Sequence, residues 1–532
     1  MEFQLADLFE CLCDARPEAD VLIAGGQRRT RAQLESRANR LAHALQSRGV
    51  GPGDHLGIYA HNRLEWVETL IACWKIRAVA ININYRYVSD ELRYIWDNAE
   101  MVALVYERGF APRVAELASG FPSLRTYLVL DDGADAEGPG IDYETALAGA
   151  SDVRDFGPRS GDDLYLVYTG GTTGMPKGVL WRHEDLYSNI ARPLTGGIER
   201  PEEIAKQADN PLNMRTLTLS PLMHGGGQWP LFITIFNGGV GLFPVSKHFD
   251  PDEVLSIIQR EGVTTLSIIG DAMGRPLAEA KLDPAKSTDT SSLMAISTGG
   301  ALLTDPVRKL LREALGKILI TGGIGSSEIG SAARETRAFD AASGPRFKLD
   351  ASVAVLDEDL RRIQPGSGRN GRLARSGHIP LGYFRDEKKT AETFVRDPDG
   401  VRWVLPGDWA RVEEDGTITL LGRGSGCINS GGEKIFPDEV EAVIVGHPSV
   451  RGATVIGVPD PNWMERVTAL VELQPGAAEL DLEAIQAHCR KHLASYKIPR
   501  ALLLCEIRRL PTGKVDSVWA KRHARESLRD KM

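Results

Sequence analysis

Residues 168–179 read Tyr-Thr-Gly-Gly-Thr-Thr-Gly-Met-Pro-Lys-Gly-Val, and they follow directly on the apolar run Leu-Tyr-Leu-Val at 164–167. An apolar strand that ends in glycines, threonines and a lysine has what a backbone needs to fold closely around a polyanion. Glycines let N–H groups approach phosphate oxygens, threonine hydroxyls add donors, and Lys177 supplies fixed positive charge. The pattern therefore predicts a nucleotide phosphate loop.

Two other interpretations of this stretch are weaker. A P-loop NTPase would place Gly before the lysine and Ser or Thr after it, whereas Pro176 and Gly178 stand there. Turns rich in glycine and threonine also join strands in proteins that bind no ligand there. The full string, with its lysine, favours phosphate binding over such a turn.

Length and composition are those of a globular enzyme with several compact units, because 532 residues exceed what one hydrophobic core organises. The net charge of −9 is spread along the chain, so no basic stripe is available to bind a nucleic acid. The six cysteines show no Cys-x-x-Cys spacing, which indicates neither a disulfide framework nor a zinc site.

The first residues lack the basic region and apolar core of a signal peptide. The longest apolar region, residues 229–243, is interrupted by Asn-Gly-Gly and is too short to span a bilayer. We therefore expect a cytoplasmic protein with no membrane span and no nucleic-acid partner, and we leave a homodimer open.

Helix and strand patterns alternate along the first hundred residues. Apolar spacing predicts a helix over 31–50, a strand over 55–60, a helix over 65–72 and a strand over 78–83. Strand, helix and strand within about thirty residues predict a parallel unit with its crossover. The fold class is therefore α/β, with layered sheets and helices. Residues 131–160, rich in Asp, Gly and Ala, predict a surface connection that leads to the phosphate-loop strand.

The string at 169–178 resembles the phosphate signature of the adenylate-forming superfamily: acyl-CoA synthetases, firefly luciferase and the adenylation domains of peptide synthetases. Further signatures follow in the superfamily's order over essentially the whole chain. The resemblance implies a large N-terminal domain of layered α/β subdomains over 1–423. It also implies a hinge at 424–426 and a small mobile α+β C-terminal domain over 427–532.

The same resemblance assigns a nucleotide and magnesium site. Residues 318–328 resemble the second nucleotide signature, with Glu328 at the magnesium position and Ile324 where an aromatic ring normally packs on adenine. Asp408 would accept both ribose hydroxyls, and Arg423 would touch ribose or phosphate. The implied ATP-binding residues are Thr169, Gly170, Gly171, Thr172, Thr173, Gly174, Lys177, Gly322, Ile324, Gly325, Ser327, Asp408, Arg423 and Lys514, and the implied metal ligands are Thr173 and Glu328.

Residues 215–227 predict a strand stopped by proline, then a histidine and three glycines, which opens space at the strand's C-terminal end. In the superfamily this stretch lines the acyl pocket, and there we favour carboxylate orientation for His224 over a general base or a packed ring. No Asp or Glu occurs between Pro211 and Phe249, so a substrate ammonium would be unpaired and an amino acid is disfavoured. The implied acyl pocket comprises Met223, His224, Gly225, Trp229, Met273, Gly299 and Gly300.

The C-terminal signatures complete the resemblance. Ser425 lies between two glycines at the implied hinge. Gly431 and Gly432 would flank the passage of the CoA pantetheine. Residues 510–516 match the terminal lysine signature, in which Lys514 is catalytic. Only 18 residues follow this lysine, too few for a carrier domain, so we expect diffusible CoA as the acceptor.

The resemblance implies an ATP-dependent acyl-CoA synthetase that joins a small-molecule carboxylic acid to CoA through an acyl adenylate. Its catalytic residues would be Lys514, His224, Glu328 and Lys177, with ATP, Mg²⁺ and CoA required. The acid-free pocket favours an apolar monocarboxylate, either a fatty acid or a bulky alicyclic or sterol side-chain acid. Two alternatives are a luciferase-like oxygenase that uses the same adenylate and a non-catalytic nucleotide-binding relative. The second is suggested by departures from the superfamily pattern at Gly170, Ile324, Pro406 and Ser425.

Overall fold

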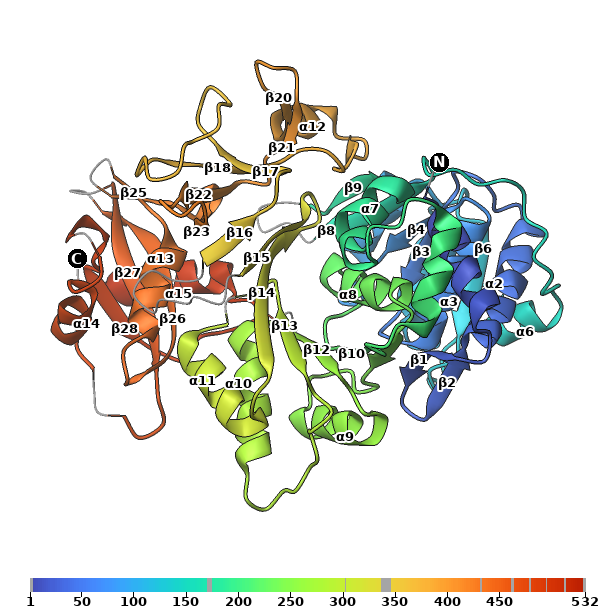
Figure 1. Cartoon of the computed structure of the whole chain (residues 1–532), viewed down its shortest axis with the longest axis horizontal. Helices are drawn as coiled ribbons and strands as arrows, with labels where there is room; N and C mark the ends of the chain where they lie inside the picture. The colour runs from blue at the N-terminus through green and yellow to red at the C-terminus, as the bar shows by residue number, and fades with distance from the viewer. Residues whose placement is uncertain are drawn as a thin grey trace.

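Three sheets organise the chain in the computed structural model (Figure 1). The structure describes residues 3–169, 175–301, 303–335, 346–430, 433–460, 464–477, 480–493, 495–510 and 513–529.

The first sheet has eight strands in the order β19-β9-β8-β4-β3-β5-β6-β7. Its strands are β3 (His55–Tyr59), β4 (Val79–Asn82), β5 (Met101–Glu107), β6 (Thr126–Leu130), β7 (Ile141–Asp142), β8 (Leu164–Thr169), β9 (Lys177–Arg182) and β19 (Gly382–Tyr383). Strands β3 and β4 are parallel and α3 (Leu64–Lys75) crosses between them, which confirms the predicted parallel unit. Strands β8 and β9 form an antiparallel pair on either side of the predicted phosphate loop.

The second sheet follows the path β2-β1-β11-β10-β12-β13-β14-β15-β16-β23-β22-β18-β21-β20, with β17 beside β18. Its strands are β1 (Asp20–Ala24), β2 (Gln27–Thr30), β10 (Arg215–Thr218), β11 (Val240–Phe243), β12 (Thr265–Ile268), β13 (Ala295–Thr298), β14 (Leu319–Ser326), β15 (Gly330–Glu335), β16 (Arg346–Leu349), β17 (Val353–Leu356), β18 (Asn370–Arg375), β20 (Phe394–Arg396), β21 (Arg402–Val404), β22 (Asp408–Val412) and β23 (Ile418–Arg423). Neighbours from β1 to β14 are parallel, and those from β14 onward are antiparallel. The change of direction occurs at β14, near the centre of the molecule (Figure 1).

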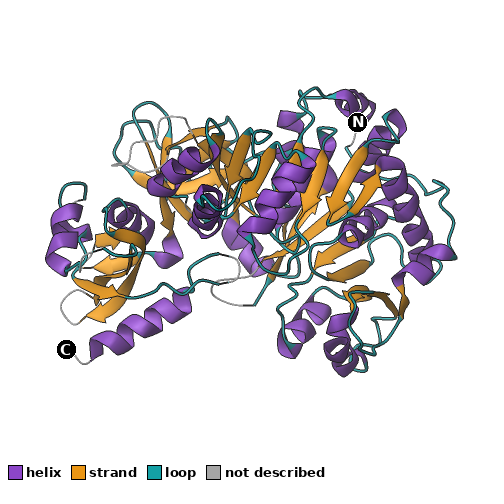
Figure 2. Ribbon diagram, turned by 90° about the horizontal axis from the view of Figure 1, so that it is seen from below, coloured by secondary structure: helices purple, strands orange, loops and turns teal. Residues whose placement is uncertain are grey.

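Helices lie between the two large sheets and on their outer faces (Figure 2). Apolar side chains of α1, α2, α3, α7 and α8 share one core with strands of both sheets. Helices α4 and α5 pack on the other face of the eight-stranded sheet, and α9 to α11 pack on the other face of the parallel strands. The bounds are α1 (Leu5–Ala15), α2 (Arg31–Gln46), α4 (Ser89–Asn98), α5 (Ala111–Ala118), α7 (His183–Ile190), α8 (Gly225–Phe236), α9 (Pro251–Glu261), α10 (Gly270–Leu282), α11 (Asp305–Leu315) and α12 (Glu387–Thr393).

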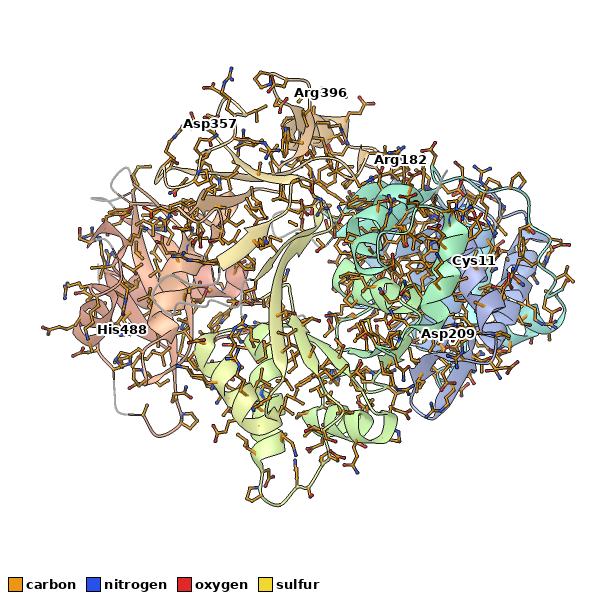
Figure 3. The ribbon with its side chains drawn as sticks, viewed as in Figure 1. Cys11, Arg182, Asp209, Asp357, Arg396 and His488 are labelled. Atoms are coloured by element: carbon orange, nitrogen blue, oxygen red, sulfur yellow. The ribbon has the colours of Figure 1, made fainter. Side chains whose placement is uncertain are left out.

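The last part of the chain forms a small unit around a five-stranded sheet with its own apolar core. A single 3₁₀ turn, Gly424–Gly426, connects β23 to this unit. Its elements are β24 (Ile428–Ser430), β25 (Glu433–Ile435), β26 (Val450–Asp460), β27 (Met464–Leu473), β28 (Ala501–Leu504), α13 (Pro437–Val445), α14 (Leu482–Cys489) and α15 (Ser517–Arg529). Figure 3 labels His488 on α14, at the far side of this unit from Arg182 on β9. The predicted fold class is confirmed, whereas the bounds 1–423, 424–426 and 427–532 stay predictions.

One prediction about the connection over 131–160 is wrong in part. Residues 141–148 form β7 and the short helix α6 (Tyr143–Ala148), and the Tyr143 side chain is fully buried. The helix forms because Asp142 caps its first turn and one face carries Tyr143, Ala146 and Leu147 into the core. Among the described residues, no helix is long and apolar enough to cross a bilayer.

Candidate active site

Strands β8 and β9 hold the two ends of the predicted phosphate loop side by side. Thr169 pairs with Lys177 in their antiparallel ladder, and its hydroxyl lies 3.4 Å from the carbonyl oxygen of Lys177. The predicted ligands Gly170, Gly171, Thr172, Thr173 and Gly174 lie outside the described residues. Of the predicted loop ligands, the structure therefore describes Thr169 at the end of β8 and Lys177 at the start of β9.

Asn82, at the end of β4, connects this hairpin to the predicted acyl pocket. Its side-chain oxygen accepts from the N–H of Tyr168 at 2.8 Å. Its amide nitrogen donates to the carbonyls of Tyr168 at 3.0 Å and Met223 at 2.5 Å. One buried side chain thus fixes the strand before the phosphate loop against the residue before His224.

The charged residues Lys177 and Glu328 lie on either side of Tyr383. The Tyr383 hydroxyl donates to Oε1 of Glu328 at 3.1 Å, and the Lys177 ammonium nitrogen is 5.6 Å from the centre of the tyrosine ring. Lys177 also forms an ion pair with Asp386 at 2.9 Å. The sequence motifs named neither Tyr383 nor Asp386, because their partners are distant in sequence and a tyrosine in a short strand resembles a core residue.

Trp181 links the same hairpin to the second nucleotide signature and to α8. Its indole N–H donates to the carbonyl of Ser327 at 2.9 Å, and its ring meets Trp229 edge to face with centroids 6.5 Å apart. A Cβ on Gly225 would lie 3.2 Å from the Trp229 ring, so glycine leaves the indole its space. These contacts bring the predicted acyl-pocket residues Gly225 and Trp229 next to the strand that carries Lys177.

His224 caps the start of α8 with its backbone carbonyl, which accepts from Gly227 and Gln228. Burial lowers the pKa of the imidazole to about 4, with a further contribution from the positive charges of Lys514 and Arg86. Within the described part of the chain its Nε2 atom has no hydrogen-bond partner. At neutral pH the ring is therefore uncharged and can offer one N–H to a substrate oxygen.

Lys514 lies at a tight turn of the small unit that reaches the large one. The N–H of Leu510 donates to the Lys514 carbonyl at 2.7 Å, and Gly513 between them takes a positive φ of 78°. A Cβ added to Gly300 would lie 3.9 Å from Cε of Lys514, and one added to Gly513 would lie 3.0 Å from Cβ of Ala272. The structure therefore places the lysine against the predicted acyl pocket.

A hydrogen bond between the two units accompanies this contact. Arg275 on α10 is only 8% exposed, and it donates to the carbonyl of Arg451 on β26 at 3.3 Å. Its helix also carries Ala272, the residue against which Gly513 packs. The first turns of α10 thus form the platform on which the lysine turn rests.

The remaining nucleotide residues lie along β14 and the β22–β23 pair. Asp408 and Arg423, the residues predicted to contact the ribose, are directly opposite in the ladder. Ile324 is 8% exposed and belongs to the core of the antiparallel strands, so it offers little surface to an adenine. The N–H of Gly322 donates to Glu335 at 2.8 Å. The roles of these residues stay predictions.

A cavity of about 270 Å³ opens beside the predicted acyl pocket, between the carboxyl ends of strands from both sheets. Met273 lines it, whereas the other predicted acyl-pocket residues do not. The cavity is mixed in character, and its walls include His61, Tyr85, Arg86, Leu219, Lys247 and Phe249.

Two α/β units that meet at a lysine-bearing turn, beside a phosphate-loop hairpin, define the architecture of an adenylate-forming enzyme. The chain belongs to the AMP-binding enzyme family, whose profile matches residues 9–384. The profile of the AMP-binding enzyme C-terminal domain matches residues 439–514.

Named relatives match over nearly the full length. The chain is 46% identical to a 3-oxocholest-4-en-26-oate–CoA ligase of Rhodococcus rhodochrous, over 98% of this chain and 96% of the relative. It is 44% identical to a medium/long-chain-fatty-acid–CoA/3-oxocholest-4-en-26-oate–CoA ligase of Mycobacterium tuberculosis strain H37Rv, over 97% and 95%.

Solved structures share the fold. ATP-bound MatB from Rhodopseudomonas palustris superposes with a TM-score of 0.83 at 25% identity, over 98% of this chain and all of that one. The anthranilate CoA ligase AuaEII, in complex with anthranoyl-AMP, gives 0.85 at 24% identity, over 99% and 98%.

Proposed function

We propose that this chain is an AMP-forming acyl-CoA ligase that activates an apolar monocarboxylate, either a fatty acid or a sterol side-chain acid. The observation that carries the proposal is the position of Lys514, which lies against Gly300 and close enough to His224 to depress its pKa. A lysine close to a neutral imidazole suits a site where a carboxylate must meet a phosphate.

The substrate class rests on charge and on the relatives. No acidic residue occurs between Pro211 and Phe249, and the adjoining cavity has Met273 and Phe249 in its wall together with one carboxylate residue, Asp250. The stretch between Pro211 and Phe249 itself offers no carboxylate to the ammonium of an amino acid. The relatives are named as ligases of a sterol side-chain acid or of fatty acids, which supports an apolar acid as the substrate. The same names favour a ligase over an oxygenase.

In the first half-reaction the substrate carboxylate attacks the α-phosphorus of ATP and pyrophosphate leaves. His224 would donate its single N–H to the carboxylate and hold one oxygen toward the phosphorus. Lys514 would lie between carboxylate and α-phosphate and stabilise the charge that grows there. Lys177 would neutralise charge on the departing phosphates.

Glu328 fits a magnesium ligand. The described residues contain no group of three or more metal-ligating side chains. Mg²⁺ commonly takes one or two protein carboxylates, with phosphates and water as its other ligands. When bound, the ion would neutralise phosphate charge during pyrophosphate loss. Thr173, the other predicted ligand, lies outside the described residues.

In the second half-reaction the CoA thiol displaces AMP from the acyl adenylate. If Lys514, which lies against Gly300 here, lies at the reacting centre during adenylation, the thiol would need the small unit to rotate away. The turn Gly424–Gly426, with Ser425 at its middle, would be the hinge. The predicted CoA-passage residues Gly431 and Gly432 lie outside the described residues.

A panel of acids tests the proposal. Pyrophosphate release with Mg-ATP would be measured for fatty acids, sterol side-chain acids, aromatic acids and amino acids, with and without CoA. We expect the fastest release with a fatty or sterol acid and a matching acyl-CoA product. Fastest release with amino acids would contradict the substrate class, and no release with any acid would indicate a non-catalytic relative. Oxygen uptake would indicate an oxygenase.

A further inference from the structure

Tyr383 interacts with two oppositely charged residues, Glu328 and Lys177, that are predicted to bind the nucleotide and its metal ion. Its hydroxyl is 3.1 Å from Glu328, and its ring centre is 5.6 Å from the Lys177 ammonium. A cation within about 6 Å of an aromatic ring is attracted by the ring's negative face. The same side chain therefore restrains both a carboxylate and an ammonium.

The backbone around Tyr383 is tied to the strand that begins with Lys177. Strand β19 pairs with β9, so that Tyr383 lies opposite Val179. The pairing continues on both sides, because Leu381 donates to Leu180 at 2.7 Å and Phe384 donates to Gly178 at 2.8 Å. Tyr383 therefore keeps a fixed distance from Lys177.

A second anchor holds the tyrosine against α12. Its N–H donates to the Thr390 hydroxyl at 2.9 Å, and its ring meets Phe394 edge to face. Asp386, three residues on, caps the same helix through the N–H of Lys389 and pairs with Lys177. The ion pair with Lys177 lowers the pKa of Asp386, so this carboxylate stays charged. Side chain and backbone are thus restrained independently of any nucleotide.

We propose that Tyr383 is a positioning residue of the nucleotide–metal site, which aims the Glu328 carboxylate at the divalent ion and keeps Lys177 beside it. The inference rests on the proposed function through the role of Glu328. A hydrogen bond to a ligating carboxylate fixes its rotamer, and loss of such a bond typically costs tenfold to a hundredfold in metal affinity.

Tyr383→Phe is the discriminating variant, because it removes the hydroxyl and keeps the ring beside Lys177. Tyr106→Phe is the matched control, since that buried hydroxyl donates at 2.7 Å to the carbonyl of Pro139 on the outer side of the eight-stranded sheet. Glu328→Gln provides the reference for loss of the ligand itself. All three would be made in the full chain, with unfolding midpoints compared to exclude misfolding.

Mn²⁺ binding is measured by its electron paramagnetic resonance signal in the presence of α,β-methylene-ATP, so the readout requires no turnover. We expect Tyr383→Phe to weaken Mn²⁺ binding about tenfold and Glu328→Gln to weaken it further, with Tyr106→Phe unchanged. Pyrophosphate release by Tyr383→Phe should recover when Mg²⁺ is raised, because only metal affinity is reduced. A purely structural role would lower the rate at every Mg²⁺ concentration.

Unchanged Mn²⁺ affinity in Tyr383→Phe, with a loss in Glu328→Gln, would overturn the inference and leave the proposed function intact. Unchanged affinity in both variants would overturn it as well, because Glu328 would then not be a metal ligand. If the wild-type protein released no pyrophosphate with any acid, the proposed function would fail, and the binding comparison would still decide the role of Tyr383.

Discussion

The two parts of the site are held in different ways. Lys177 and Glu328 are restrained within the large unit by sheet pairing and by Tyr383, Asp386 and Trp181. Lys514 reaches Gly300 and the surroundings of His224 from the small unit, through a tight turn that rests on α10. From this difference we propose that the nucleotide side is preassembled, whereas the lysine is delivered by the position of the small unit.

The largest expected effect comes from Glu328→Gln, which removes the carboxylate proposed to hold the metal. A metal ion supplies several kcal/mol of charge stabilisation in phosphoryl chemistry, so adenylation should fall about a thousandfold. The apparent affinity for Mg-ATP should fall as well, since this residue belongs to the preassembled side. Pyrophosphate release measured over a range of Mg²⁺ and ATP concentrations checks both. If pyrophosphate release by Glu328→Gln depended on Mg²⁺ as it does in the wild type, Glu328 would not be the metal ligand.

Ser425→Pro should slow one half-reaction about tenfold more than the other. Proline fixes φ in the turn Gly424–Gly426, and a restricted hinge should slow one orientation more than the other. Single-turnover rates for adenylation and for thioester formation from supplied acyl adenylate measure the separation. Equal slowing of both steps would count against a hinge at this turn.

Arg275→Ala should slow adenylation about threefold to tenfold and leave thioester formation from supplied adenylate unchanged. The variant removes one hydrogen bond between the units, worth roughly 1 kcal/mol. Arg451→Ala is the control, because its carbonyl oxygen, which accepts the bond, remains. Similar slowing in both variants would mean that the contact does not stabilise this orientation.

No effect on activity is expected from Glu441→Gln in the small unit, which should change stability alone. Glu441 accepts from the Val455 N–H and the Thr454 hydroxyl. Burial and the neighbouring charge of Asp438 raise its pKa to about 8. Between pH 4.5 and 8 the folded chain keeps a proton that the unfolded chain loses, so stability falls as pH rises.

The contribution of this carboxyl is at most about 1.4 kcal/mol per pH unit within that window. Glutamine cannot titrate, and the variant should therefore lose less stability than the wild type between pH 6 and pH 8. Urea unfolding midpoints at the two pH values measure the difference. Parallel shifts in both proteins would show that Glu441 is ionised when folded.

The sequence predicted those parts of the candidate site whose residues lie close together along the chain. The phosphate-loop strand was predicted from its own glycines, threonines and lysine, whereas the nucleotide segment at β14 and the Lys514 turn were identified through the resemblance to the adenylate-forming superfamily. Tyr383 and Asp386 were missed because the partners of these residues lie 55 and 209 positions away. The composition of residues 131–160 did not predict α6, because the burial of Tyr143 depends on tertiary contacts.

The contacts between the two units could not be predicted from the sequence either. Nothing in the residues around Arg275 indicates that its guanidinium meets a backbone carbonyl of β26. The depressed pKa of His224 depends on burial under α8 and on the approach of Lys514. The Arg275 contact and the contribution of Lys514 to the His224 pKa follow from how the small unit docks, which no local pattern encodes.

The division between a preassembled nucleotide side and a delivered lysine is tested most directly with Lys514→Ala. Both half-reactions would be followed in single turnover, with the acid that releases pyrophosphate fastest and with its chemically supplied adenylate and CoA. Lys521→Ala, an exposed lysine on α15, serves as control, and circular dichroism excludes misfolding.

We expect Lys514→Ala to slow adenylation about a hundredfold or more, because a charge that stabilises the transition state is lost. ATP affinity and thioester formation should stay near the wild-type values. Normal adenylation, or an equal loss in both half-reactions, would contradict the role assigned to the lysine.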